Sequence, residues 1–184
     1  MNTVIITLKK EISRAEFVAG YVDIPRFAGC CMRCKGYGRT WACPPYDFDV
    51  SDFWNDCSSV LLYGKKVIVP QEMLDKVYEP DELKKAYYGL LKPVKRDMLD
   101  ELFDMERQYE GSIALSSGGC DFCEKCARLS DKPCVHPEKK RYSVESIGGD
   151  VVKSLKELFN EEIVWASDGR LPEHYILLGA LLKK

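Results

Sequence analysis

The cysteines are the residues of this chain whose type and spacing point most directly to chemistry. The 184-residue chain has nine, and four of them lie in residues 118–137, at Cys120, Cys123, Cys126 and Cys134. The first three stand at successive two-residue intervals, so a tight loop can turn their sulfurs toward one point. The spacing is close to the C-x2-C-x2-C-x3-C-P run of bacterial ferredoxins, with a longer last interval here. This segment therefore predicts a metal site.

A second group of cysteines lies in residues 29–46. Cys30, Cys31 and Cys34 are followed by Cys43, which leads directly into two prolines. The group predicts a second metal site, with either Cys30 or Cys31 at one corner, or else a loop with buried thiols. In two-cluster ferredoxins the fourth cysteine of each run binds the other cluster. An exchange of Cys43 and Cys134 between the two sites is therefore a further arrangement that the spacing allows.

Disulfides are the competing use of these thiols. The odd number of cysteines and an N-terminal stretch, MNTVIITLKK, that lacks the pattern of a secretory leader argue against them. Zinc sites usually combine two separated cysteine pairs or include histidine. His136 is the histidine placed to replace a thiolate, but three cysteines at successive short steps favour a [4Fe–4S] cluster. Zinc remains the alternative, and Cys57 stands apart from both groups.

The composition limits the partners that we expect. The net charge is −2 and the pI about 5.8, which predict neither nucleic acid nor an anionic membrane as a partner. No apolar stretch reaches the roughly 20 residues that span a bilayer, so we expect a cytoplasmic protein. The basic run Lys139–Arg141 is either a solvated turn, a set of counter-charges for a thiolate-rich cluster, or a docking patch for an acidic redox partner.

The elements that must position the cysteines follow from hydrophobic periodicity. Strands are predicted at 3–9, 60–69 (one central strand covered on both faces, or two short strands broken at residues 64–66), 112–115, 163–166 and 174–182, and helices at 14–19, 47–57, 80–109 and 143–159. Gly89 and Pro93 predict a kink or a break in the long helix. The start of the helix at 143 is expected to face the cluster. The predicted fold is a single α+β domain over residues 1–184, a mostly antiparallel sheet with two long helices on one face and two cysteine-rich metal-binding loops.

Several stretches together resemble a family of small proteins predicted to bind metal through a domain of unknown function. They are the C-x2-C of the first group, GRTWACPPY, ERQYEGSIALSSGGCDFCEKC, RYSVESIGGDV and a closing apolar strand, from about Cys30 to Leu182. The family occurs mostly in anaerobic bacteria and archaea. The resemblance implies metal binding through the Cys120 group and through Cys30 or Cys31, Cys34 and Cys43. It does not imply a reaction.

Three functions follow as hypotheses. The first is a small iron–sulfur protein that transfers electrons to a partner protein or acts as an accessory redox subunit. The second is a zinc-stabilised binding module without redox activity. The third is an enzyme whose cluster has an open coordination site, with polar residues such as Arg39, Tyr46 and Arg141 beside it. The sequence shows no Gly-rich nucleotide loop and no Ser–His–Asp set.

Overall fold

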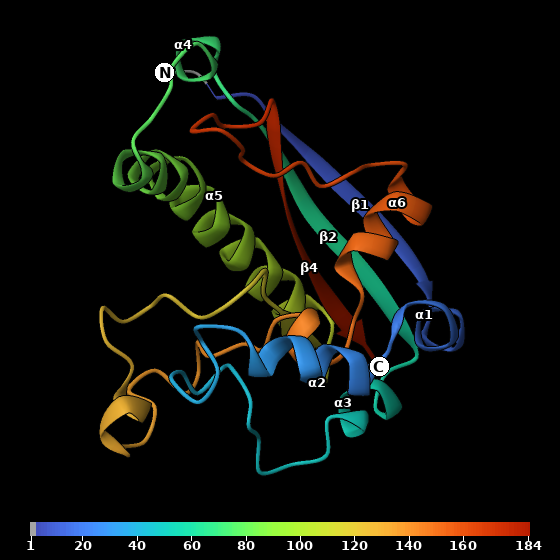
Figure 1. Ribbon diagram of the computed structural model, residues 1–184. Helices are drawn as coiled ribbons and strands as arrows, with labels where there is room; N and C mark the ends of the chain where they lie inside the picture. Colours follow the sequence, from blue (N-terminus) through green and yellow to red (C-terminus); the bar gives the residue numbers. More distant parts are fainter. Residues whose placement is uncertain (1–2) are drawn as a thin grey trace.

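The computed structural model describes residues 3–184, and a four-stranded sheet forms its centre (Figure 1). The strand order is β1-β2-β4-β3, and every neighbouring pair is antiparallel. In chain order the elements are β1 (Ile5–Ser13), α1 (Arg14–Tyr21), α2 (Ile24–Met32), α3 (Ser51–Asn55), β2 (Ser59–Ile68), α4 (Gln71–Leu74), α5 (Pro80–Gln108), β3 (Ile113–Leu115), the 3-10 turns η1 (Ala127–Ser130) and η2 (Glu145–Ile147), α6 (Val151–Phe159) and β4 (His174–Lys183). This mixture of helices with an antiparallel sheet agrees with the predicted α+β class.

Both faces of the sheet are covered, because its two inner strands are apolar on both sides. Leu61 in β2 belongs to the core formed with α5, whereas the next residue, Leu62, belongs to the core on the other face with Phe17 of α1. In β4, Leu181 and Leu182 divide between the two cores in the same way. Successive side chains of a strand point to opposite faces, so a continuous apolar run marks a strand buried on both. The predicted central strand at 60–69 is confirmed.

The prediction of two long helices on one face is wrong. Only α5 is long, with 29 residues, and α6 has 9 and packs on the opposite face of the sheet. The helix predicted over 143–159 is interrupted because Gly148, at φ +96°, ends η2 in the left-handed region. Asp150 then starts α6 as its N-cap. Figure 1 shows α5 on one side of the sheet and α1 and α6 on the other.

Two further expectations are corrected. The break predicted in the long helix does not occur, since α5 is continuous through Gly89 and Pro93. The strand predicted at 163–166 does not form: Ile163 packs against the core, but Val164 is 43 % exposed and Trp165 is 75 % exposed. A segment with so few buried side chains lacks the packing that holds a strand in a sheet. Within residues 3–184, no helix is both long and apolar enough to cross a membrane.

Candidate metal centre

The two cysteine segments, which are far apart in the sequence, are joined by side-chain contacts. Figure 1 shows the loop after α2 beside the loop that contains η1. Arg128 donates hydrogen bonds to the backbone oxygens of Thr40 (2.8 Å), Pro45 (2.7 Å) and Cys43. The indole nitrogen of Trp41 donates to the Lys132 oxygen at 2.9 Å. These bonds hold residues 40–45 against residues 126–132.

Arg128 also lies over the ring of Trp41. Its guanidinium carbon is 5.0 Å from the ring centroid, a distance at which a cation is attracted to the face of an indole. The same arginine thus satisfies three backbone oxygens and stacks on an aromatic ring. Sequence reasoning missed both roles, because nothing in the local pattern pairs residue 128 with residues 40–45.

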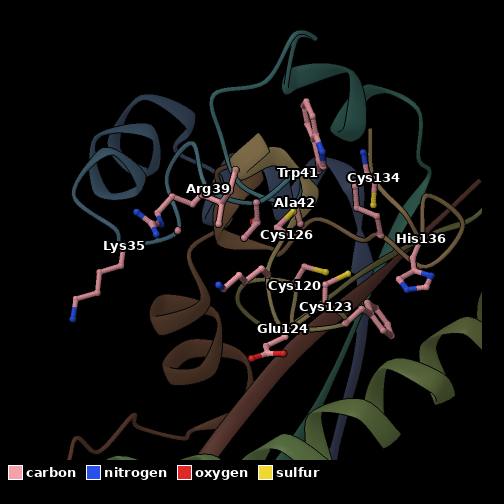
Figure 2. A pocket seen from close by; sticks show the side chains of 16 residues that line it. Lys35, Arg39, Trp41, Ala42, Cys120, Cys123, Glu124, Cys126, Cys134 and His136 are labelled. Carbon is pink, nitrogen blue, oxygen red and sulfur yellow. The ribbon is translucent and has the colours of Figure 1, made fainter. Parts of the chain in front are cut away.

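A pocket of about 360 Å³ opens between the two segments (Figure 2). Its lining includes all four cysteines of the predicted cofactor site, Cys120, Cys123, Cys126 and Cys134. Thr40, Trp41 and Ala42 of the first segment complete one wall, and His136 also borders the pocket. Since one water takes about 30 Å³ in the liquid, this space is much larger than a single ion needs.

The first cysteine group is only partly a loop. Cys30 and Cys31 lie in the last turn of α2, and Cys34 and Cys43 follow it. A Cβ atom added at Gly36 would lie 3.2 Å from the sulfur of Cys43 and 3.8 Å from that of Cys34. The two sulfurs therefore flank the same small gap.

Cys31 belongs to the same neighbourhood as Cys34 and Cys43. Burial, together with the adjacent Cys43 and Cys34 thiols, raises the pKa of the Cys31 thiol to about 11. Cys30 is exposed, and its sulfur lies 3.7 Å from a guanidinium nitrogen of Arg33. Of the two alternatives for this corner, Cys31 is the thiol with the less exposed position.

Cys43 lies at the boundary between the two groups. A Cβ atom at Gly119, the residue before Cys120, would be 3.9 Å from the Cys43 sulfur. Cys134, by contrast, is close enough to Cys120 for its thiol to raise the pKa of Cys120, after burial as the main cause. The exchange of Cys43 and Cys134 between two sites stays a prediction.

All four thiols of the second segment border this pocket. Within residues 3–184, no group of three or more His, Cys, Asp or Glu side chains is arranged to hold a single metal ion. In a tetrahedral zinc site, bonds of about 2.3 Å hold the sulfurs about 3.8 Å apart. In a [4Fe–4S] cluster each thiolate binds a different iron, so the sulfurs stand further apart around a larger body. The donor set and the pocket fit a cysteine-ligated cluster.

Lys95 of α5 is the cation that both cysteine groups share. It is 17 % exposed, donates to the backbone oxygen of Gly119 and lies 3.5 Å from the Asp121 carboxylate. Burial raises the pKa of Cys43 and of Cys120, and the Lys95 charge opposes both shifts. Metal ligation requires the thiolate form, so this lysine favours the state that binds metal.

Sequence reasoning missed this role of Lys95. The signal that identifies it is its position four residues after Leu91 and three before Met98. Both of these residues are buried, so Lys95 falls on the inward stripe of the helix. At such a position the aliphatic part of a lysine side chain packs against apolar neighbours, and its ammonium group reaches a polar partner beyond them.

Replacing Lys95 by methionine should weaken metal retention by about 10–100-fold, the usual loss when a residue that supports ligands is removed. The measurement is metal content after dialysis against increasing concentrations of a chelator. Lys92→Met is the matched control, since Lys92 lies one turn away on the exposed face of the same helix. Equal retention in the two variants would contradict the role given to Lys95.

Glu145 is a partly buried acid near the first cysteine group. Its Oε2 atom is buried without a hydrogen-bond partner, and burial raises the pKa of the carboxyl. Its charge also contributes to the raised pKa of Cys31. Sequence reasoning missed this residue, because an acidic side chain near a helix start is an ordinary feature.

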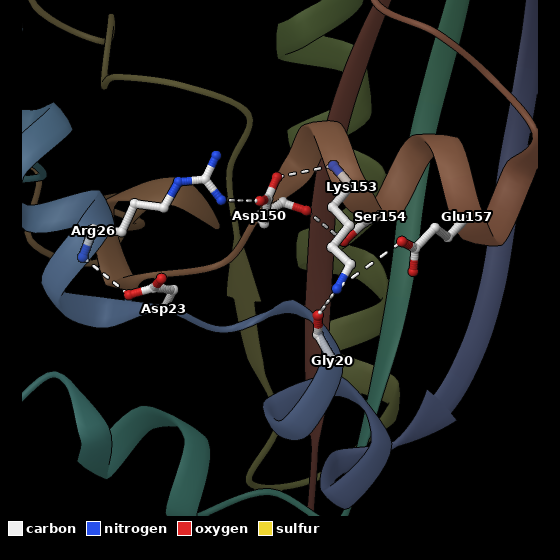
Figure 3. Close-up of polar contacts among 7 residues, drawn as sticks. All are labelled: Gly20, Asp23, Arg26, Asp150, Lys153, Ser154 and Glu157. Carbon is white, nitrogen blue, oxygen red and sulfur yellow. Dashed lines mark hydrogen bonds and ion pairs between the residues drawn. The ribbon is translucent and has the colours of Figure 1, made fainter.

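The helix that carries Cys30 and Cys31 is anchored at its other end (Figure 3). Asp23 caps α2 by accepting from the backbone N–H of Arg26 at 3.0 Å. The Arg26 guanidinium is 2.8 Å from the carboxylate of Asp150, which itself caps α6 by accepting from the backbone N–H of Lys153 at 2.9 Å. Two helix starts therefore share one ionic contact. The α6 N-terminus faces this contact, and α6 contributes no residue to the cysteine-lined pocket, so the prediction that it faces the cluster is wrong.

Asp150→Ala should lower the free energy of unfolding by about 2 kcal/mol, because it removes the α6 cap and the partner of Arg26. Asp150→Asn should lose less, since asparagine caps a helix as well as aspartate does. Urea denaturation measures both. Asp97→Ala, at an exposed position of α5, is the control and should change stability by less than about 0.5 kcal/mol. A loss no larger than this in Asp150→Ala would contradict the anchoring.

Cys57 takes no part in the site. It is 7 % exposed within the core shared by Trp54 and Leu62, and its thiol donates to the Trp54 backbone oxygen at 3.5 Å. Burial raises the pKa of this thiol. It is a small apolar filler, as the sequence indicated.

With the cysteine-lined pocket described, the comparisons with known proteins define the class. The thiols around the pocket are a donor set that can hold a metal. Residues 22–182 match the family described as "Predicted metal-binding protein (DUF2284)", and the chain belongs to that family. No match to the chain is found among curated proteins or among solved structures.

Proposed function

We propose that this protein holds a [4Fe–4S] cluster through Cys120, Cys123, Cys126 and Cys134 and serves as a carrier of electrons. The observation that carries the proposal is that these four thiols, three of them at successive two-residue intervals, border one pocket of about 360 Å³. That spacing suits the corners of a multi-metal cluster better than a tetrahedral zinc ion.

The first group extends the proposal to a second site. Cys31, Cys34 and Cys43 supply three thiols, and Cys43 also lies against the start of the second segment. Two neighbouring sites joined by Arg128 and Trp41 would allow an electron to enter near one segment and leave near the other. Cys30, which is exposed, stays available as an alternative ligand.

When bound, such a cluster accepts and donates single electrons at a potential set by its surroundings. The chain's own residues prepare that site in three ways. The cysteines supply thiolates, and the charges of Lys95 and Arg128 offset the negative charge at Cys43. Trp41, with Arg128 over its ring, forms part of one wall of the pocket. Lys95 holds the Gly119 oxygen and so orients the chain entering Cys120.

The test is an absorption spectrum of protein purified without oxygen, with iron, sulfide and zinc counted per chain. Visible absorption that dithionite bleaches reversibly, with about four or eight irons, is the expected result. A colourless protein with one or two zinc ions, which unfolds when a chelator is added, would replace the proposal by a zinc-stabilised binding module. A cluster spectrum that changes when a small molecule binds would instead indicate an enzyme with an open coordination site.

A further inference from the structure

The charges of this chain are distributed very unevenly. Residues 24–46 contain four basic side chains and no acidic one, and residues 118–141 contain six basic and four acidic ones. The two cysteine segments thus have a net charge of +6, and the rest of a chain with a total of −2 has −8. The overall charge of −2 does not reveal this uneven distribution. The two basic segments become neighbours only because the fold brings them together.

Much of this positive charge faces solvent without a partner. Arg26 and Arg141 form ion pairs within the chain, Arg128 donates to backbone oxygens and Lys140 donates to the Tyr142 hydroxyl. Six other basic residues of the two segments are exposed and form no ion pair within residues 3–184: Arg33, Lys35, Arg39, Lys125, Lys132 and Lys139. Three of them, Lys35, Arg39 and Lys125, also line the cysteine pocket.

Exposed apolar side chains lie among these charges. Met32 is 61 % exposed, Leu129 49 % and Val135 62 %, and each comes from one of the two cysteine segments. Grouped apolar side chains with surrounding arginine and lysine are typical of protein interfaces. The one tryptophan of these segments, Trp41, is covered by Arg128 and hydrogen-bonded to Lys132. One face of this ring is thus occupied by Arg128, which leaves less aromatic surface for stacking a base and favours a protein partner over nucleic acid.

We propose that this basic face around the cysteine pocket is the docking surface for an acidic protein, an electron carrier with a negatively charged surface around its own redox centre. The electron-transfer part rests on the proposed function, whereas the docking rests on the charges and the exposed apolar side chains. Opposite surface charges speed and orient the encounter of two proteins, and the pocket at the centre of the face brings the two redox centres together. One electron then passes between them, so that one centre is oxidised as the other is reduced.

The experiment measures binding of the metal-loaded protein to a purified acidic ferredoxin at low and at high salt. We expect binding at low salt that weakens as salt increases, and that falls about tenfold or more in the triple variant Lys35→Glu, Lys125→Glu, Lys139→Glu. The matched control reverses three exposed lysines of α5, Lys84→Glu, Lys85→Glu, Lys92→Glu, and should bind like the wild type.

Three outcomes would overturn the docking surface. They are no binding at low salt, equal losses in the two triple variants, or tighter binding to a DNA duplex than to the ferredoxin at the same salt. Metal content and colour are determined on the same samples. A brown, cluster-loaded protein that fails to bind would refute the docking surface alone, and a colourless protein that binds as expected would refute electron transfer alone.

Discussion

Cys123→Ala should abolish the metal site of the second segment. Cys123 lies between Cys120 and Cys126 and borders the same pocket as both, so its loss leaves three thiols around a space that four enclose. A cluster bound at four corners then lacks a ligand at one iron. We expect the iron content to fall by the whole of one cluster, with the loss of the corresponding visible absorption. Because metal binding stabilises the folded state, the variant should also unfold at a lower denaturant concentration.

The control for this experiment is Cys57→Ala. Cys57 is buried in the core away from both cysteine groups, so its replacement should leave the metal content unchanged and cost about 1 kcal/mol in stability. Unchanged metal content in Cys123→Ala would show that the ligands have been assigned wrongly. A loss of metal in Cys57→Ala would also show that the ligands have been assigned wrongly.

Arg128→Met should separate the two cysteine segments. The change removes hydrogen bonds to the backbone oxygens of Thr40, Cys43 and Pro45, and each bond from a charged donor contributes about 1.5–3 kcal/mol when shielded from water. Part of the guanidinium is exposed, so we expect a total loss of about 2–3 kcal/mol in the unfolding free energy of the metal-free protein. Metal retention should fall as well, because Cys43 is no longer held against Gly119.

Arg170→Met is the matched control, since Arg170 is exposed in the turn between α6 and β4. Denaturation of the metal-free proteins and metal content after dialysis are measured on both variants. If Arg128→Met unfolds at the same midpoint as Arg170→Met and keeps its metal, the contact between the two segments does not depend on Arg128. Arg128→Lys tests the geometry, because a lysine keeps the charge but loses the planar fork that reaches several oxygens.

The strands illustrate what local pattern can determine. Residues 60–69 and 174–182 are nearly continuous apolar runs, and such runs predict strands buried on both faces, as β2 and β4 are. The same local logic failed at residues 163–166, where Val164 and Trp165 remain exposed. It also failed at residues 143–159, where Gly148 divides one predicted helix into η2 and α6. A pattern shows which residues are apolar but not whether another element is present to cover them.

By itself, the sequence determined the chemistry that this protein has at its disposal. Cysteine is the residue that binds soft metals, and its two-residue spacing is a local property, so the two groups and their family could be identified without coordinates. Only the tertiary structure decided that both groups meet at one end of the molecule, with Lys95 between them and Arg128 across them. The reason is physical. A hydrogen bond from residue 128 to residue 40 depends on how the sheet, α2 and α5 pack, and the spacing of residues close together in the sequence does not determine that packing.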